Sequence, residues 1–302
     1  MARPAADAGL FPVFHPDALV HQARQDQAGA GEGNLAMNLI VRFAGVFLLA
    51  AAGVALAQGE ARLIPAPSVS GFERDASLQR GARNFANYCL NCHSAQYMRY
   101  NRLTDLGLTE AQIKDNLMFA TEKIGGTMTV AMTTADATAW FGAPPPDLSV
   151  EARVRGKDWL YSYLLAFYRD DKTATGWNNL VFPNVAMPHA LWTLSGQKKL
   201  VDIEYEDRDK AEAAAVAAKG LVLVEPAVGG KYFVKTLTEG TPGALTNVEY
   251  ERFVSDLVNY LDYISEPVKN DRINIGIVVL IFLGVLFALV YALKRDYWKE
   301  LH

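Results

Sequence analysis

The chain contains only two cysteines, and both belong to one short motif. Cys89 and Cys92 lie three residues apart and His93 follows directly, which gives C-x-x-C-H within 302 residues. This spacing is the attachment signature of c-type haem. Cysteines at i and i+3 project from one side of a helical turn, so both sulfurs can bond the porphyrin while the next imidazole approaches the iron. We expect a core organised around one covalently bound haem c.

Two other uses of a C-x-x-C pair fit the sequence less well. A redox-active dithiol is typical of a βαβ context, which the surrounding pattern does not predict. A structural zinc site needs four ligands, and the sequence offers no second group of Cys and His residues. The motif therefore favours haem attachment.

The sixth ligand of the iron must come from another part of the chain. Met187 lies in a proline-bounded loop over residues 182–188, and His/Met ligation raises the reduction potential of a haem. His189 is the rival ligand. The alternative is that His189 is an ordinary histidine of the core or the surface that binds no metal. Met98 follows the motif too closely to reach the opposite face of the porphyrin. The other methionines are expected to fill gaps in the core: Met118, Met128 and Met132.

Two apolar runs predict the relation of the chain to a membrane. Residues 37–57 combine a basic start, an apolar stretch and a small-residue end, which predicts a secretory signal peptide cleaved near Ala57, with an uncleaved membrane helix as the alternative. Residues 1–36 are expected to be a non-functional extension. Residues 273–293 carry no charge and are long enough to cross a hydrocarbon core of about 30 Å, which predicts a membrane span. The alternative is a buried core helix.

The order of these runs predicts four parts: the extension, the signal peptide, a haem domain over residues 58–268 and an anchor with a short tail over residues 269–302. Export of the middle part would place the haem domain in the periplasm and the C-terminus in the cytoplasm of a bacterial-type cell. The predicted fold is mostly α, with long loops, one small hairpin and a single C-terminal transmembrane helix. Its expected helices cover residues 75–93, 157–169, 211–219 and 247–264, and its expected hairpin strands cover 221–224 and 231–234.

The charge of the chain limits its partners. A formal net charge of −4 at pH 7 argues against a nucleic-acid partner, which calls for a basic surface. Residues 202–212 hold a cluster of carboxylates: Asp202, Glu204, Glu206, Asp207, Asp209 and Glu212. We advance the hypothesis that this segment steers a basic cytochrome c, while a solvated loop is the equally simple interpretation.

Several short motifs lie before and after the haem signature in a fixed order. They are Arg80-Gly81, Tyr97, Pro145-Pro146-Asp147-Leu148-Ser149, Arg155 with Asp158-Trp159, the loop 182–188, Ser265-Glu266-Pro267 and the run 294–299 after the apolar span. In this order the chain resembles the cytochrome c1 family, the haem subunits of the cytochrome bc1 complex. Trp159 stands where that family commonly has Tyr, and the stretch after Arg155 is shorter than in its mitochondrial members.

The resemblance implies a role for each matching residue. Cys89 and Cys92 would form the thioethers, and His93 and Met187 would be the axial ligands. Pro145 and Pro146 would pack on the histidine side of the haem. Arg155 would hydrogen-bond a haem propionate, with Arg153 as a close competitor.

The resemblance also implies a function and its partners. The chain would accept electrons from the Rieske iron–sulfur protein and pass them to cytochrome c, beside cytochrome b and membrane lipid. It would be an electron carrier by itself and part of an enzyme, ubiquinol–cytochrome c oxidoreductase, only within the complex. The alternative is a free-standing, membrane-tethered c-type cytochrome that serves another oxidase or reductase.

Overall fold

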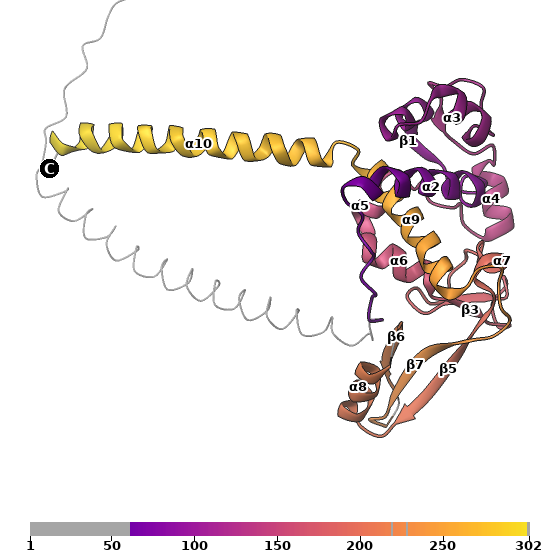
Figure 1. The fold of residues 1–302 in the computed structure, drawn as a ribbon. Helices are drawn as coiled ribbons and strands as arrows, with labels where there is room; N and C mark the ends of the chain where they lie inside the picture. Colours follow the sequence, from indigo (N-terminus) through magenta and orange to yellow (C-terminus); the bar gives the residue numbers. More distant parts are fainter. Residues whose placement is uncertain (1–60, 219, 228, 301–302) are drawn as a thin grey trace, which may run out of the picture. The chain divides into compact units, whose positions relative to one another are not determined.

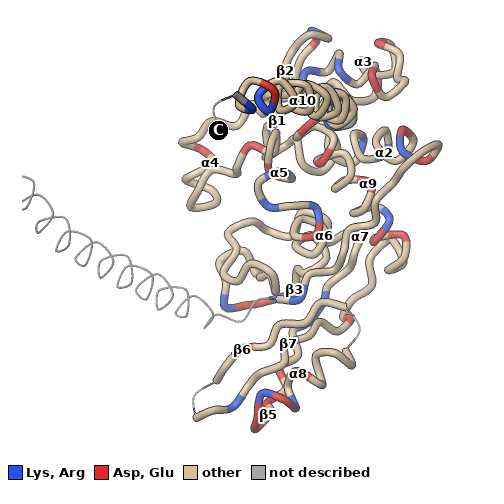
Figure 2. Tube along the Cα trace, turned by 90° about the vertical axis from the view of Figure 1, so that its left-hand side faces the viewer, with Lys and Arg blue, Asp and Glu red and all other residues tan. Residues whose placement is uncertain are grey.

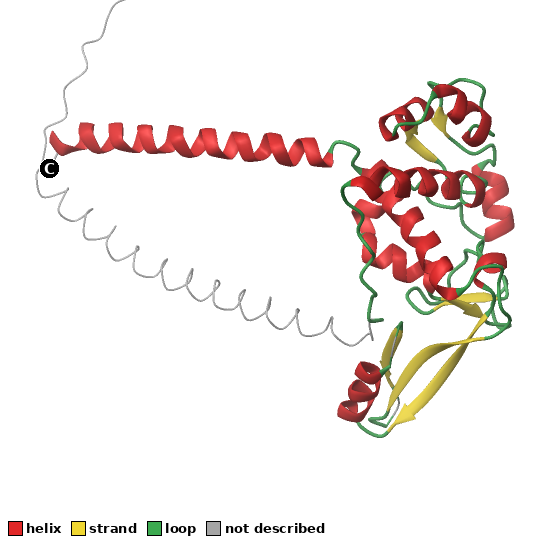
Figure 3. Cartoon of the chain, in the orientation of Figure 1, coloured by secondary structure: helices red, strands yellow, loops and turns green. Residues whose placement is uncertain are grey.

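A computed structural model describes residues 61–218, 220–227 and 229–300. The predicted extension 1–36 and signal peptide 37–57 lie outside the described residues. The helices are α2 (Phe72–Tyr88), η1 (Tyr100–Leu106), α3 (Glu110–Leu117), α4 (Thr134–Phe141), α5 (Glu151–Arg155), α6 (Lys157–Leu165), α7 (Trp192–Ser195), α8 (Arg208–Ala217), α9 (Asn247–Ser265), α10 (Lys269–Tyr297) and η2 (Trp298–Glu300). The strands are β1 (Ala95–Arg99), β2 (Thr127–Met128), β3 (Phe167–Arg169), β4 (Trp177–Asn179), β5 (Lys198–Tyr205), β6 (Val222–Pro226) and β7 (Tyr232–Glu239). Figure 3 shows helices with small sheets joined by long loops, which confirms the predicted fold class.

The helices α2 and α9 pack side by side and form the centre of the main core. Their close approach depends on Gly81, because a Cβ there would overlap the carbonyl oxygen of Asp256 and lie 2.6 Å from Tyr260 Cβ. The largest buried side chains at this contact include Phe85, Tyr260 and Leu257. The core therefore holds α2, whose C-terminal end leads into the C-x-x-C-H motif, against a helix whose contacting residue Asp256 lies 176 positions after Arg80.

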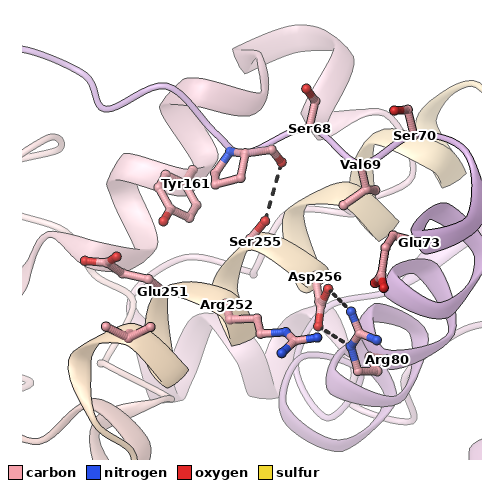
Figure 4. A pocket seen from close by; sticks show the side chains of 12 residues that line it. Ser68, Val69, Ser70, Glu73, Arg80, Tyr161, Glu251, Arg252, Ser255 and Asp256 are labelled. Atoms are coloured by element: carbon pink, nitrogen blue, oxygen red, sulfur yellow. Dashed lines mark hydrogen bonds and ion pairs between the residues drawn. The ribbon is translucent and has the colours of Figure 1, made fainter.

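An ion pair reinforces the contact between α2 and α9 (Figure 4). Arg80 donates from Nε to Asp256 Oδ2 at 2.6 Å and from Nη2 to Oδ1 at 3.0 Å. The hydroxyl of Ser77 donates to the same Oδ1 at 2.6 Å, so the buried carboxylate of Asp256 is well satisfied. An open groove of about 550 Å³ runs beside this pair, and its charged lining carries both signs.

The sequence explains where α9 starts and which face it buries. Thr246 and Glu249 form a capping box, in which Glu249 Oε2 accepts from the Thr246 backbone N–H at 2.9 Å. Apolar and tyrosine side chains then recur at helical spacing over residues 250–264 and are buried. The helix ends at Ser265, ahead of Glu266-Pro267, which confirms the prediction for residues 247–264.

Two predicted helices are shorter than expected. The helix predicted over residues 75–93 starts earlier but ends at Tyr88, and the haem motif lies in the turn that follows. The helix predicted over residues 157–169 ends at Leu165 as α6, and its last residues instead form β3, which pairs antiparallel with β4. This pairing is a contact with a strand later in the chain, which helical periodicity in one segment cannot reveal.

A three-stranded antiparallel sheet with the order β5-β7-β6 follows the motif-bearing part of the chain. The strands β6 and β7 confirm the predicted hairpin around Gly229-Gly230, whereas β5 was not predicted. The helix α8 packs Ala211 and Ala215 against Val222 and Val234 and forms a small second core. It starts at Arg208 and ends at Ala217, close to the prediction for residues 211–219.

The helix α10 is the one helix among the described residues that is long and apolar enough to span a membrane. Its apolar side chains from Ile273 to Leu293 are exposed, so it contributes no buried face to the core. The alternative of a buried core helix is therefore wrong. Its length and composition are consistent with the predicted single transmembrane anchor.

Candidate haem site

The C-x-x-C-H motif occupies one turn at the C-terminal end of α2. The backbone N–H groups of Cys92 and His93 both donate to the carbonyl oxygen of Cys89, at 3.0 and 2.8 Å. Both cysteines are free and partly exposed. Burial, and to a smaller extent Cys92, raises the pKa of the Cys89 thiol to about 12. The turn therefore presents two thiols and an imidazole from a backbone that is fixed by α2.

His93 is oriented by a backbone carbonyl. Its side chain is 9% exposed, and Nδ1 lies 2.8 Å from the carbonyl oxygen of Pro146. Since a carbonyl can only accept, Nδ1 carries the proton and Nε2 carries the lone pair. Nε2 makes no hydrogen bond with any residue that the structure describes. Burial lowers the pKa of His93 in spite of the Pro146 carbonyl, which keeps this imidazole neutral and fit to bind a metal.

The loop that carries Pro146 is fastened beside the motif by several hydrogen bonds. Leu148 N–H donates to Ser94 O at 2.8 Å, and Ser149 Oγ accepts from the Tyr97 N–H at 3.0 Å. The carboxylate of Asp147 accepts from backbone N–H groups on both sides, of Gln96 and of Ser149, each at 2.9 Å. The motif 145–149 and the haem motif are thus brought together. Pro145 is partly buried and Pro146 is exposed.

Met187 lies against a small aromatic cluster in the loop after β4. Its side chain is partly buried and packs on Phe167, Trp177 and Val185. The hydroxyl of Tyr163, which projects from α6, lies 3.3 Å from the Met187 sulfur and donates to it. The thioether is therefore held in place and has an identified hydrogen-bond donor.

The rival ligand His189 is part of the core. It is 4% exposed, and its Nε2 lies 2.8 Å from Ser195 Oγ. Its ring stacks on Phe167 at 4.7 Å between centroids with an interplanar angle of 3°, and meets Trp177 edge-on. Burial, assisted by Lys198, lowers its pKa to about 3. These contacts engage the ring face and Nε2 and hold His189 within the core.

Arg155 belongs to a column of side chains that leads to Met187. Its guanidinium carbon lies 4.7 Å from the ring centroid of Trp159, and Trp159 stacks on Tyr163 at 4.9 Å. Arg155 Nε also pairs with Glu151 Oε1 at 3.1 Å. Its competitor Arg153 is exposed. The predicted propionate contact of Arg155 stays a prediction.

Sequence reasoning singled out Met187 and Arg155 but missed Tyr163, which connects them. The available signal was the spacing of four between Trp159 and Tyr163, which places both side chains on one face of α6, whereas Arg155 ends α5. Tyr163 packs against both the main core, which Cys89 also borders, and the cluster around Met187. It therefore joins the motif side of the site to the ligand loop.

The predicted filling of the core holds for two of the three methionines concerned. Met128 is buried and Met118 packs against the main core from its edge, whereas Met132 is half-buried and belongs to none of the core clusters of the described residues. Met98 is also buried. Within the described part of the chain no three His, Cys, Asp or Glu side chains gather as a metal-binding group. The motif thus offers a neutral imidazole and two thiols, and the loop after β4 offers a thioether. This donor set fits a c-type haem.

Comparison with known proteins decides the family. The sequence profile of the Cytochrome C1 family matches residues 68–222 and 242–301. The chain belongs to the cytochrome c1 family. Membership implies a haem cofactor, and the site described above has the residues to hold one.

Individual relatives cover most of the chain. Cytochrome c1 of Allochromatium vinosum is 43% identical over 257 residues, which are 85% of this chain and 97% of the relative. A Nitrosomonas europaea protein named ammonia monooxygenase gamma subunit is 44% identical over 226 residues, 75% of this chain and 84% of the relative. Mitochondrial cytochrome c1 of Neurospora crassa is 29% identical over 250 residues, 74% of this chain and 62% of the relative.

Proposed function

We propose that this chain is the cytochrome c1 subunit of a bc1 complex and relays single electrons from a Rieske iron–sulfur protein to a cytochrome c. The observation that carries the proposal is the geometry of His93 in a member of this family. The Pro146 carbonyl binds Nδ1–H and leaves the Nε2 lone pair free, on the same turn as two free thiols.

Each site residue has a part in holding the haem. Cys89 and Cys92 provide the two thioether bonds, His93 Nε2 is the proximal ligand and the Met187 sulfur is the distal ligand. Pro145 and Pro146 form an apolar wall beside His93, and Arg155 pairs with a propionate. The bound haem supplies one-electron redox chemistry, while the chain sets its potential, its exposure and its orientation.

The membrane arrangement follows from the two apolar runs. The helix α10 anchors the chain in the lipid, with Lys294, Arg295 and Lys299 on the cytoplasmic side. The haem domain then lies in the periplasm, where the signal peptide predicted at residues 37–57 directs it. Cytochrome b is the neighbour expected within the membrane.

The acidic segment 202–212 carries fewer free charges than its composition suggests. Glu204 pairs with Lys231, Asp207 with Lys210, and Arg208 with Glu212. Figure 2 shows acidic and basic residues close together near β5. Asp202, Glu206 and Asp209 form no ion pair with the residues described, so any attraction of cytochrome c by this segment depends mainly on them.

The alternative function is a tethered cytochrome that works outside a bc1 complex. One observation favours this alternative. The Nitrosomonas europaea relative is named ammonia monooxygenase gamma subunit, and this name does not refer to a bc1 complex. The two functions differ in what accompanies the chain in the membrane, which a purification can detect.

The test is affinity purification of the tagged chain from its own membranes in a mild detergent, followed by reduced-minus-oxidised spectra and identification of the bound proteins. We expect b-type haem and an iron–sulfur protein to accompany the c-type signal. A c-type signal without b-type haem would favour the tethered carrier. The control is the double variant Cys89→Ala, Cys92→Ala, in which the covalent haem signal should disappear.

A further inference from the structure

Tyr163 makes one specific polar contact with the proposed distal ligand. Its hydroxyl lies 3.3 Å from the Met187 sulfur, within the range for a hydrogen bond to sulfur. Burial raises the pKa of Tyr163 above the ordinary value, so its hydroxyl is protonated at neutral pH and can act as the donor, with the thioether as the acceptor. The contact joins α6 to the loop after β4 and does not depend on neighbours in the sequence.

The ring of Tyr163 is fixed from several sides. Trp159 stacks on it at 4.9 Å with an interplanar angle of 10°, and Phe167 meets it edge-on at 5.1 Å. The side-chain amide of Asn179 donates to the Tyr163 carbonyl oxygen at 2.8 Å, which also fastens the backbone. Few rotamers remain for the hydroxyl, so its direction toward Met187 is set by the fold.

A thioether sulfur has two lone pairs, of which an iron can use only one. A hydrogen bond to the second lone pair withdraws electron density from the sulfur and weakens its donation to the metal. Since the oxidised iron depends more on that donation than the reduced iron does, the hydrogen bond favours the reduced state. Hydrogen bonds to ligand atoms are among the means by which proteins adjust haem potentials.

We propose that Tyr163 is a positioning residue that donates a hydrogen bond to the axial sulfur of Met187 and thereby raises the reduction potential of the haem. The inference rests on the proposed function, in which Met187 is the distal ligand. It assigns to Tyr163 the role of tuning the potential, while the role of binding the iron stays with Met187.

The chain offers a matched control. Tyr260 donates from its hydroxyl to the sulfur of Met128 at 3.4 Å, and both side chains are buried in the main core. The variants Tyr163→Phe and Tyr260→Phe therefore remove the same chemical group from the same kind of contact. Only the first contact involves a proposed ligand.

The experiment is a redox titration of the holoprotein in its native membranes for both variants. It is combined with the red charge-transfer band that marks methionine bound to ferric haem. For Tyr163→Phe we expect the band to remain and the potential to fall, with the equilibrium constant for reduction about fivefold lower, as for the loss of one hydrogen bond. Tyr260→Phe should leave both unchanged. A ring-fluorinated tyrosine at position 163, a stronger donor with the same contacts, should raise the potential.

The outcomes separate this inference from the proposed function. An unchanged potential in Tyr163→Phe with the band retained would overturn the tuning role and leave Met187 as ligand. Loss of the band in that variant would also overturn it, because the hydroxyl would then be needed to hold the ligand. If Met187→Leu kept the band, the ligand assignment itself would be wrong.

Discussion

At the residue scale, the site depends on which atom of each side chain is already engaged. His93 has its Nδ1 bound to the Pro146 carbonyl, so Nε2 is available to a metal. His189 has its Nε2 bound to Ser195 and its ring stacked on Phe167, so it is used by the core. The two histidines thus differ in which ring nitrogen is engaged, and the roles proposed for them differ accordingly.

This contrast predicts the behaviour of His189 variants. Replacing His189 with Gln should leave the haem spectrum and the methionine charge-transfer band unchanged. It should lower the free energy of unfolding by about 1–3 kcal/mol, because a buried hydrogen bond and a stacking contact are disturbed. Spectra and urea unfolding of the holoprotein measure the two effects. A lost axial ligand in this variant would show that the loop binds iron through His189.

The carboxylate of Asp170 predicts a small pH dependence of stability. The side-chain amide of Asn178 and the Lys172 N–H donate to it, and these bonds lower its pKa from the usual value of 3.8. A folded-state pKa below the unfolded one means that the unfolded chain binds the proton first as pH falls. The contribution of Asp170 to the free energy of unfolding is therefore fully present above the pKa of this group in the unfolded chain. It is lost as pH falls through the pKa of the group in the folded chain.

Replacing Asp170 with Asn should accordingly lower stability at pH 7 by less than about 1 kcal/mol, since the group is largely solvated. The difference in unfolding free energy between wild type and variant should shrink when unfolding is measured at a pH below the ordinary pKa of an aspartate. A difference that stayed constant down to pH 2–3, roughly, would contradict this account.

At the element scale, the packing of α2 on α9 holds the haem motif in place, and Gly81 is its most restrictive position. A methyl group there would overlap the backbone of α9 at Asp256, so Gly81→Ala must move the helices apart. We expect a loss of about 1–3 kcal/mol or more in unfolding free energy. Chemical unfolding of the purified holoprotein measures it.

The matched control for Gly81→Ala is Gly125→Ala. A Cβ at Gly125 meets no atom within 4 Å, and its backbone has an ordinary φ. This variant should change stability little. Equal losses in the two variants would show that the effect comes from the loss of glycine itself, not from the approach of α9.

The elements show what could be predicted from the sequence and what could not. The helix α9 and the hairpin of β6 and β7 were predictable, because a capping box, helical periodicity and a glycine pair are local signals. The strand β5 and the early end of α6 were not, since both depend on pairing with later segments. In the site, C-x-x-C-H is local, but the Pro146 carbonyl and the Tyr163 hydroxyl reach their partners across 53 and 24 positions.

At the scale of the whole molecule, the anchor helix and the haem domain are separable in their contacts. The helix α10 buries no apolar side chain in the described structure. At the junction, Lys269 pairs with Asp262 at 3.6 Å and Arg272 pairs with Glu266, and surface pairs of this kind contribute little to stability. The core of the haem domain is therefore complete without α10.

A chain that ends at Val268 should consequently fold, attach haem and appear in the soluble periplasmic fraction. Haem-stained gels and spectra of the fractions measure this, with the full chain in the membrane fraction as reference. If the truncated chain stayed with washed membranes, either residues 37–57 would remain as an uncleaved membrane helix or the haem domain would have an attachment of its own, and the N-terminal sequence of the product separates the two. A second variant, with an unrelated apolar span in place of residues 269–297, separates membrane anchoring by α10 from a contact of α10 with cytochrome b. This variant should return to the membrane, because any sufficiently long apolar span anchors a chain. Cytochrome b should copurify with it only if contacts outside α10 hold the complex together.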